Sequence, residues 1–221
     1  RVLSLGSYDL SETAMRYDRK WIFALAVIGI PAAHGLHGYV GFVFGSLKSR
    51  EWWSSDLMPA VFLFSAIISG TALMILVYVV SCKLRKVPVD LPCLKGMAYA
   101  LWGFMMFTLL LEGLEFASLV YRGREGIEVI LHYVSTQLIV PFFILQFGVG
   151  SVVPLLILTS MFWRRTTGTA LVGGITVCAA LVLLSVFLMR WNVVIGGQEI
   201  SKTARGLLSY QPTILGRESL L

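Results

Sequence analysis

Residues 34–39 read His34-Gly35-Leu36-His37-Gly38-Tyr39, and they lie in the middle of an apolar run that extends from residue 21 to residue 47. This run exceeds the roughly 20 residues that a helix needs to cross a bilayer. Histidines inside such a run are expensive to place in lipid, so they are candidates for function. The stretch therefore predicts a membrane-spanning helix that carries hydrogen-bonding or proton-exchanging groups.

The composition of the whole chain indicates a membrane protein as well. Of its 221 residues, 57% are apolar and 14% are charged, far from the usual balance of a soluble domain. In a membrane protein, a net charge of +6 helps to set the topology and to bind lipid head groups. We expect no nucleic-acid partner, because no basic stripe is interleaved with base-stacking aromatic residues. The cysteines form no C-x-x-C pair and no C-x-x-C-H haem-attachment motif, so we expect no iron–sulfur cluster in this chain. We expect no metal site either.

The hydropathy pattern predicts an all-α polytopic membrane protein with about five transmembrane helices in one membrane domain, residues 1–221. The spans are expected at about 21–47, 57–81, 96–121, 134–162 and 169–189, followed by a polar tail on the outer face at 190–221. A short helix over residues 11–17 is expected to lie at the membrane interface. The chain starts without Met and stops where another helix could open, so we expect it to be a fragment of a larger subunit.

The distribution of basic residues predicts the orientation. Lys and Arg are more frequent on the side of residues 1–20, 82–95 and 164–165 than in the loops on the opposite side. By the positive-inside rule the first side faces the cytoplasm, which predicts a multi-pass protein of the cytoplasmic membrane.

The first predicted span carries the first candidate site. At the period of a helix, His34, His37 and Gly38 fall on one side, and glycines there let a flat ligand or a partner helix approach closely. A quinone ring needs hydrogen-bonding groups at its carbonyl oxygens and groups that exchange protons, and histidine suits both roles because its pKa lies near neutrality. The alternative is that the imidazoles bond neighbouring helices. Haem ligation is disfavoured, since one helix face cannot ligate both sides of a haem.

Two carboxyl groups form the second candidate site. Glu112 and Glu115 share one face of the third span, and they suit either proton relay or neutralisation by protonation or ion pairing. Asp56 is expected to cap the second span or to receive a proton near the outer surface. Trp52 and Trp53 are typical of an interfacial aromatic belt.

The remaining candidates are polar side chains near these groups. We expect the quinone to be lined by Tyr39, Ser65, Ser69, Arg190 and Asn192. For Arg190 and Asn192 the ordinary alternative is a polar helix end, with the long arginine side chain reaching the interface.

Several segments together resemble the NrfD/polysulfide-reductase membrane subunits. They are His34–Phe42, Trp52-Trp53-Ser54-Ser55-Asp56-Leu57-Met58-Pro59 and Ser65–Gly70. Residues 190–198, Arg-Trp-Asn-Val-Val-Ile-Gly-Gly-Gln, are similar to the branch that contains the hydrogenase-2 membrane subunits and DsrP of DsrMKJOP-type complexes.

The resemblance implies a haem-free subunit that binds menaquinone or another quinone and belongs to a larger bundle of about ten spans. It also implies a periplasmic iron–sulfur partner, further membrane and cytochrome subunits, and anaerobic sulfur respiration with a possible role in proton translocation. Part of the quinone pocket is then expected on spans outside this chain. Two functions follow as hypotheses: a quinone-linked oxidoreductase subunit, or a structural anchor and proton-conducting subunit with no quinone site in this chain.

Overall fold

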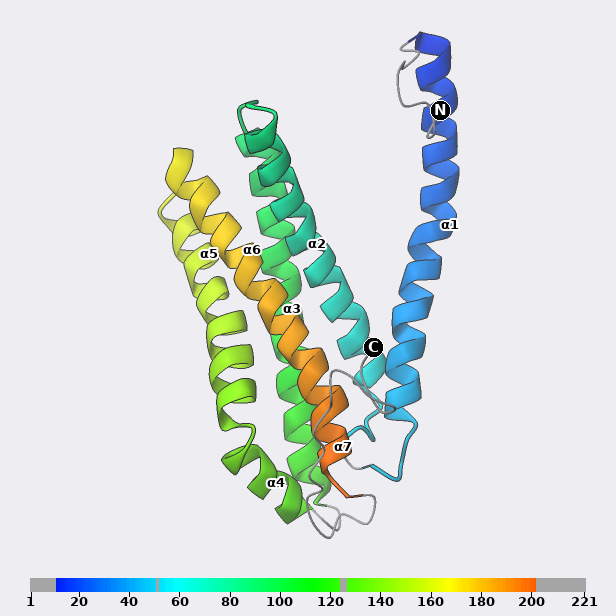
Figure 1. The fold of residues 1–221 in the computed structure, drawn as a ribbon, viewed down its shortest axis with the longest axis vertical. Coiled ribbons are helices and arrows are strands. Elements are labelled where there is room, and N and C mark those ends of the chain that lie inside the picture. The colour runs from blue at the N-terminus through cyan, green and yellow to red at the C-terminus, as the bar shows by residue number, and fades with distance from the viewer. Residues whose placement is uncertain (1–10, 51, 124–126, 202–221) are drawn as a thin grey trace, which may run out of the picture.

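A computed structural model describes residues 11–50, 52–123 and 127–201, apart from the side chain of Arg122 (Figure 1). The regular elements in these ranges are helices. In chain order they are α1 (Glu12–Gly45), α2 (Met58–Leu84), α3 (Leu91–Arg122), α4 (Ile127–Thr136), the π-helix η1 (Ile139–Val152), α5 (Val153–Trp163), α6 (Gly168–Trp191), the π-helix η2 (Asn192–Gly196) and α7 (Gly197–Glu199).

Five helical stretches in the described residues are long and apolar enough to cross a membrane: Glu12–Gly45, Met58–Leu84, Leu91–Tyr121, Ile139–Trp163 and Gly168–Glu199. The predicted all-α membrane bundle is therefore confirmed. Of the predicted tail at 190–221, the first residues continue the last helical stretch, and residues 202–221 lie outside the described part.

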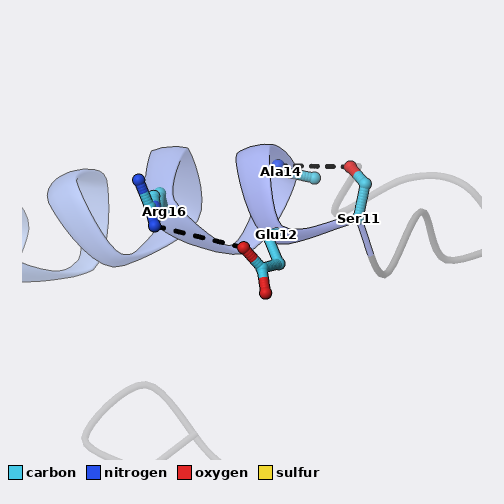
Figure 2. Close-up of polar contacts among 4 residues, drawn as sticks. All are labelled: Ser11, Glu12, Ala14 and Arg16. Atoms are coloured by element: carbon cyan, nitrogen blue, oxygen red, sulfur yellow. Dashed lines mark hydrogen bonds and ion pairs between the residues drawn. The ribbon is translucent and has the colours of Figure 1, made fainter.

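The start of α1 differs from the prediction of a separate interfacial helix. The Ser11 hydroxyl accepts a hydrogen bond from the backbone N–H of Ala14 (3.3 Å), which is a helix N-cap. Arg16 and Glu12 are 4.0 Å apart on the first turns (Figure 2). Residues 12–17 are thus the beginning of one helix of 34 residues.

The start of α2 corrects a second expectation. Leu57 occupies the N-cap position, Pro59 lies in the first turn, and Asp56 is exposed. The loop hydroxyl that accepts a nearby backbone N–H is that of Ser55, bonded to Leu57 N at 3.1 Å. Asp56 is therefore not the cap of this helix.

The core lies between α2, α3, α5 and α6, which stand side by side in Figure 1. Its fully buried residues include Ala72 of α2, Ala98 of α3, Leu158 of α5 and Ala179 of α6. Small side chains allow the backbones of membrane helices to approach closely, where packing rather than the hydrophobic effect holds the helices together.

Helix α1 stands apart from this core over most of its length (Figure 1). Only Ala14 and Gly41 are buried among its described residues. A Cβ atom on Gly41 would lie 2.6 Å from Cα of Pro59, so the absence of a side chain is what lets the end of α1 meet the start of α2. Gly45 likewise permits close approach to Ser55, whereas a Cβ atom on Gly38 would have nothing within 4 Å.

The fourth span begins as the π-helix η1 and continues as α5. π-helical turns carry i to i+5 bonds and are often found where function requires a displaced side chain. Gly150 of η1 packs directly against Ser185 of α6. The π-helix therefore lies tightly on α6 and presents its polar groups to that helix.

Candidate functional site: the Trp52 cavity

A cavity of about 80 Å³ lies where the α1–α2 loop meets α3, η1 and η2. We call it the Trp52 cavity. Its polar lining residues are Trp52, Ser54, Ser55, Glu112, Glu115, Ser118 and Gln146, and its apolar ones are Met58, Val61, Phe116, Leu119, Phe142, Met189 and Val193. The volume is several times the roughly 15 Å³ that one water molecule requires. The space thus combines apolar walls with a small set of hydrogen-bonding groups, as ligand sites do.

The two predicted carboxyl groups both line this cavity. Glu112 and Glu115 are one helical turn apart on α3. Glu112 also borders a second, smaller space of about 10 Å³, together with Thr108, Ser151 and Ser185. Glu112 therefore lies between the Trp52 cavity and a small, mainly apolar space deeper in the bundle.

An amide pair from the two π-helical segments lies beside the Glu112 carboxyl group. Gln146 is buried in η1 and lines the Trp52 cavity together with Glu112. The Nδ2 of Asn192 in η2 donates to Gln146 Oε1 at 2.9 Å. Because that oxygen accepts from Asn192, the Gln146 amide N–H is the group that can donate toward Glu112.

The backbone of Gln146 is also fully used. Its carbonyl oxygen accepts hydrogen bonds from the hydroxyls of Ser185 (3.0 Å) and Ser151 (3.2 Å), and these hydroxyls are themselves 3.0 Å apart. Ser151 is five residues beyond Gln146, the spacing of the π-helix. The irregular backbone thus places a satisfied polar network inside the bundle, as the apolar surroundings require.

The neighbouring tryptophans of the α1–α2 loop have different roles. The Trp53 Nε1 donates to the carbonyl of Val193 at 2.6 Å, and the Arg50 guanidinium lies 5.0 Å from the centre of its ring. Arg50 also donates to the carbonyl oxygens of Gly197 and Ile200. These contacts fasten the loop to residues 193–200, of which Val193 lines the cavity.

Trp52 points its ring edge toward Phe142, with 6.3 Å between the ring centres. Its Nε1 is buried and has no hydrogen-bond partner among the described residues. Buried N–H groups are nearly always paired, so a cavity-lining indole without a partner is a donor available to a ligand or a water molecule. The Nε1 atoms of both tryptophans point into the protein. The sequence instead predicted an aromatic belt that faces the membrane surface.

The predicted residues of α1 lie away from this cavity. His34 and His37 bond through Nδ1 to carbonyl oxygens of their own helix, Ile30 O at 2.6 Å and Ala33 O at 2.9 Å. His34 and Tyr39 are exposed, and His37 and Gly38 are half-buried. The structure keeps these four together on α1 but does not join them to the carboxyl groups.

The other predicted residues divide between two places. Arg190 donates to the hydroxyl of Ser65 at 3.3 Å and lies over the ring of Phe62, 5.4 Å from its centre. The Ser69 hydroxyl donates to Ala66 O of its own helix at 3.1 Å. Asn192 belongs to the Gln146 network, whereas Asp56 is exposed and does not line the cavity.

Sequence reasoning missed Gln146, Ser151 and Ser185, and it did not assign Trp52 to a site. Gln146 had a usable signal, because it is the single amide in the apolar run Ile139–Val152, where a buried polar side chain needs a partner. The serines and Trp52 had no such signal, because serine packs readily between membrane helices and tryptophan is common near interfaces.

The sequence of this chain is similar to one protein family and to two curated proteins. Residues 5–201 match the family described as "Polysulphide reductase, NrfD". The chain is 29% identical over 231 aligned residues to a subunit of selenate reductase from Mesobacillus selenatarsenatis, covering 97% of this chain and 52% of that protein. It is 30% identical over 179 residues to a putative membrane subunit of dimethyl sulfoxide reductase from Halobacterium salinarum, covering 78% of this chain and 40% of that protein. The chain thus spans about half the length or less of these curated relatives.

Proposed function

This chain belongs to the NrfD family of polysulphide reductase membrane subunits, and we propose that it exchanges electrons between a membrane quinone and a partner subunit of a reductase complex. The observation that carries the proposal is the Trp52 cavity. It combines a buried indole N–H that has no partner in the described residues with two carboxyl groups and aromatic walls.

The chemistry of this lining fits a quinone head group. A quinone is a flat ring with two carbonyl oxygens, and it takes up two electrons and two protons to become a quinol. The Trp52 Nε1 is a donor suited to a carbonyl oxygen, while Phe116 and Phe142 supply apolar faces for the ring. Glu112 and Glu115 are positioned to supply or remove protons on the same side of the bundle.

The α1 histidines remain a second candidate position for the quinone. His34 and His37 each use Nδ1 on a carbonyl oxygen of α1, so Nε2 is the nitrogen that would serve a ligand. In this second position the quinone would be lined by Gly38, Tyr39, Ser65, Ser69 and Arg190. The Trp52 cavity is favoured because there the donor and the carboxyl groups line the same space.

We also propose the finer assignments as one set. Menaquinone is the proposed quinone, a periplasmic iron–sulfur subunit is the proposed electron partner, and cytochrome and further membrane subunits complete the complex. The Arg190–Gln198 segment supports a place in the branch with DsrP and the hydrogenase-2 membrane subunits. The names of the two relatives, for selenate and dimethyl sulfoxide, support an oxidised sulfur or selenium compound as the terminal substrate.

The other candidate function is a membrane anchor and proton conductor without a quinone site. The small size of the Trp52 cavity favours it, since about 80 Å³ suits a few water molecules better than a ring. Glu112 and Glu115, one helical turn apart on the wall of this cavity, also suit proton movement.

One set of variants separates the two functions. Trp52→Phe keeps an aromatic ring and removes the indole donor, which should raise KM for menaquinol in the intact complex by roughly three- to tenfold if that donor binds the quinone. Trp102→Phe is the matched control, because its Nε1 is bonded to Thr159 Oγ1 at 2.9 Å outside the cavity. His34→Leu with His37→Leu tests the α1 position by the same assay.

The result assigns the function. A raised KM in Trp52→Phe alone supports the quinone site in the cavity, and a loss in the histidine variant moves it to α1. Unchanged quinone turnover in all variants, with proton movement impaired in Glu112→Gln, would establish the anchor and proton conductor instead.

A further inference from the structure

A larger hollow, distinct from the small space beside Glu112, lies next to the Trp52 cavity. It is bounded by the end of α3, by α4 and by the start of η1. We call it the α4 groove. Its volume is about 440 Å³, and its walls are Phe116 of α3, four residues of α4, and Ile139 and Phe143 of η1. Leu131, Ile139 and Phe143 are 37 to 45% exposed. These exposed apolar side chains lie where two membrane spans end and begin, so the groove opens toward the lipid region.

The cavity and the groove share one wall, which is the ring of Phe116. Its centre lies 6.4 Å from the ring of Phe142 and 5.8 Å from that of Phe143, and those two rings are 5.1 Å apart. Phe142 borders the cavity and Phe143 borders the groove. A thin aromatic partition therefore separates the carboxyl-lined space from the lipid-facing one.

The two volumes indicate what the partition does. Ligand sites usually measure roughly 300 to 1,000 Å³. The groove lies within this range, whereas the cavity at about 80 Å³ is too small for a ring while the partition is closed. Rotation of the Phe116 side chain would join the two spaces without any change in the backbone, and such rotations are fast compared with turnover.

The lining of the groove matches a hydrocarbon chain. Of its seven lining residues, five are apolar, and the polar ones are His132 and Ser135 of α4. The Ser135 hydroxyl is engaged with His132 O at 3.0 Å. The described residues place no carboxylate, Lys or Arg on its walls, so the groove suits an uncharged apolar chain that continues into the polar cavity.

We propose that the α4 groove holds the isoprenoid tail of the quinone and that Phe116 is the movable wall through which the ring reaches the Trp52 cavity. This inference rests on the proposed quinone function, which it extends by naming the route of access. The tail is chosen over a phospholipid chain because the groove is continuous, across one side chain, with the space that holds the donor and the carboxyl groups.

The test compares quinols that differ only in the tail, using the intact complex in proteoliposomes. Menaquinol carries the isoprenoid tail and menadiol lacks it. Leu131→Trp fills the groove and does not touch the cavity, so it should lower kcat/KM for menaquinol roughly tenfold and leave the value for menadiol within about twofold. Leu156→Trp is the matched control, because Leu156 is an exposed leucine on α5 and lines neither hollow.

A second measurement locates the tail directly. A menaquinone with a diazirine on its tail should label the peptide that contains residues 131–139, and Leu131→Trp but not Leu156→Trp should abolish the labelling. An equal loss with both quinols, or no loss with menaquinol, would overturn the groove proposal while leaving the quinone function in place. Labelling by a diazirine phospholipid that excess menaquinone does not displace would assign the groove to lipid and overturn the proposal as well.

If Trp52→Phe and Glu112→Gln leave turnover of both quinols unchanged, the proposal of a quinone site in the Trp52 cavity is itself refuted.

Discussion

Replacing Trp52 by phenylalanine should not destabilise the protein, although the residue is a tryptophan with a buried Nε1. A buried donor without a partner costs roughly 1–3 kcal/mol, and Trp52→Phe removes that donor while retaining an aromatic ring near Phe142. The smaller ring loses some packing, so the net change in the free energy of unfolding should lie between zero and a gain of about 1 kcal/mol.

Trp53→Phe, one residue along the chain, should have the opposite effect. It breaks the 2.6 Å bond to the carbonyl of Val193 and weakens the contact with Arg50, whose guanidinium lies 5.0 Å from the ring centre. Leaving that carbonyl unpaired costs roughly 1–3 kcal/mol, and part of a cation–π contact of about 0.5–1 kcal/mol is lost with it. The two variants should therefore differ by about 2 kcal/mol or more in the free energy of unfolding.

The assay measures unfolding by the reactivity of a thiol that is buried in the folded protein. Cys178 is fully buried in the core, so its reaction with a thiol reagent during a titration with SDS in mixed micelles reports unfolding. Cys82 and Cys93 are replaced beforehand, because they are more accessible. If Trp52→Phe lost as much stability as Trp53→Phe, the Trp52 donor would have a partner in the protein, and the argument for a free donor in the cavity would be refuted.

Three further outcomes follow from individual contacts. Gly41→Ala should destabilise the packing of α1 on α2 in the same titration, because its Cβ would collide with the first turn of α2, whereas Gly38→Ala, with nothing within 4 Å, should be tolerated. Asn192→Leu should lose about 1–3 kcal/mol of stability in that titration, because it leaves the buried Oε1 of Gln146 unpaired. Burial, and then the hydrogen bond to the Glu199 carboxylate, raise the pKa of Tyr133 on α4, so the stability it contributes is complete below the ordinary tyrosine pKa of about 10 and is lost above it. Hydroxide catalyses the exchange of every amide, so the quantity to compare is the protection factor. The protection factor of the α4 amides should fall above about pH 10 in the native chain and stay constant in Tyr133→Phe.

The sequence was sufficient for the fold because the thickness of a bilayer limits the possible answers. A run of apolar residues long enough to cross has to be a helix, since its backbone groups find no water to bond. The ends of the helices were harder. Ser11 starts α1 well before the apolar run, because capping is decided by local hydrogen bonds rather than by hydropathy.

The candidate site was predictable only where a residue is expensive to bury. Glu112 and Glu115 stood out for that reason, and the structure places both on one cavity. The helical period put His34 and His37 on a common face, but it does not tell which helix covers that face. The role of Trp52 depends on contacts between the loop and residues about 140 positions later, such as the bond from Trp53 to Val193, and no local pattern reveals those.

The hydrogen bonds that Trp53 and Arg50 make from the α1–α2 loop to residues 193–200 also have a consequence for biogenesis. Membrane helices emerge from the ribosome in order, so α2 and α3 can pack long before α6 and η2 exist. The Trp52 cavity cannot, because Met189 and Val193 form part of its wall and Trp53 has its partner on Val193. An assembly intermediate that lacks the last helical stretch would already have its carboxyl groups in the membrane but would lack Met189 and Val193 beside them. The full set of residues that line the Trp52 cavity is therefore present only when the chain through η2 has been inserted.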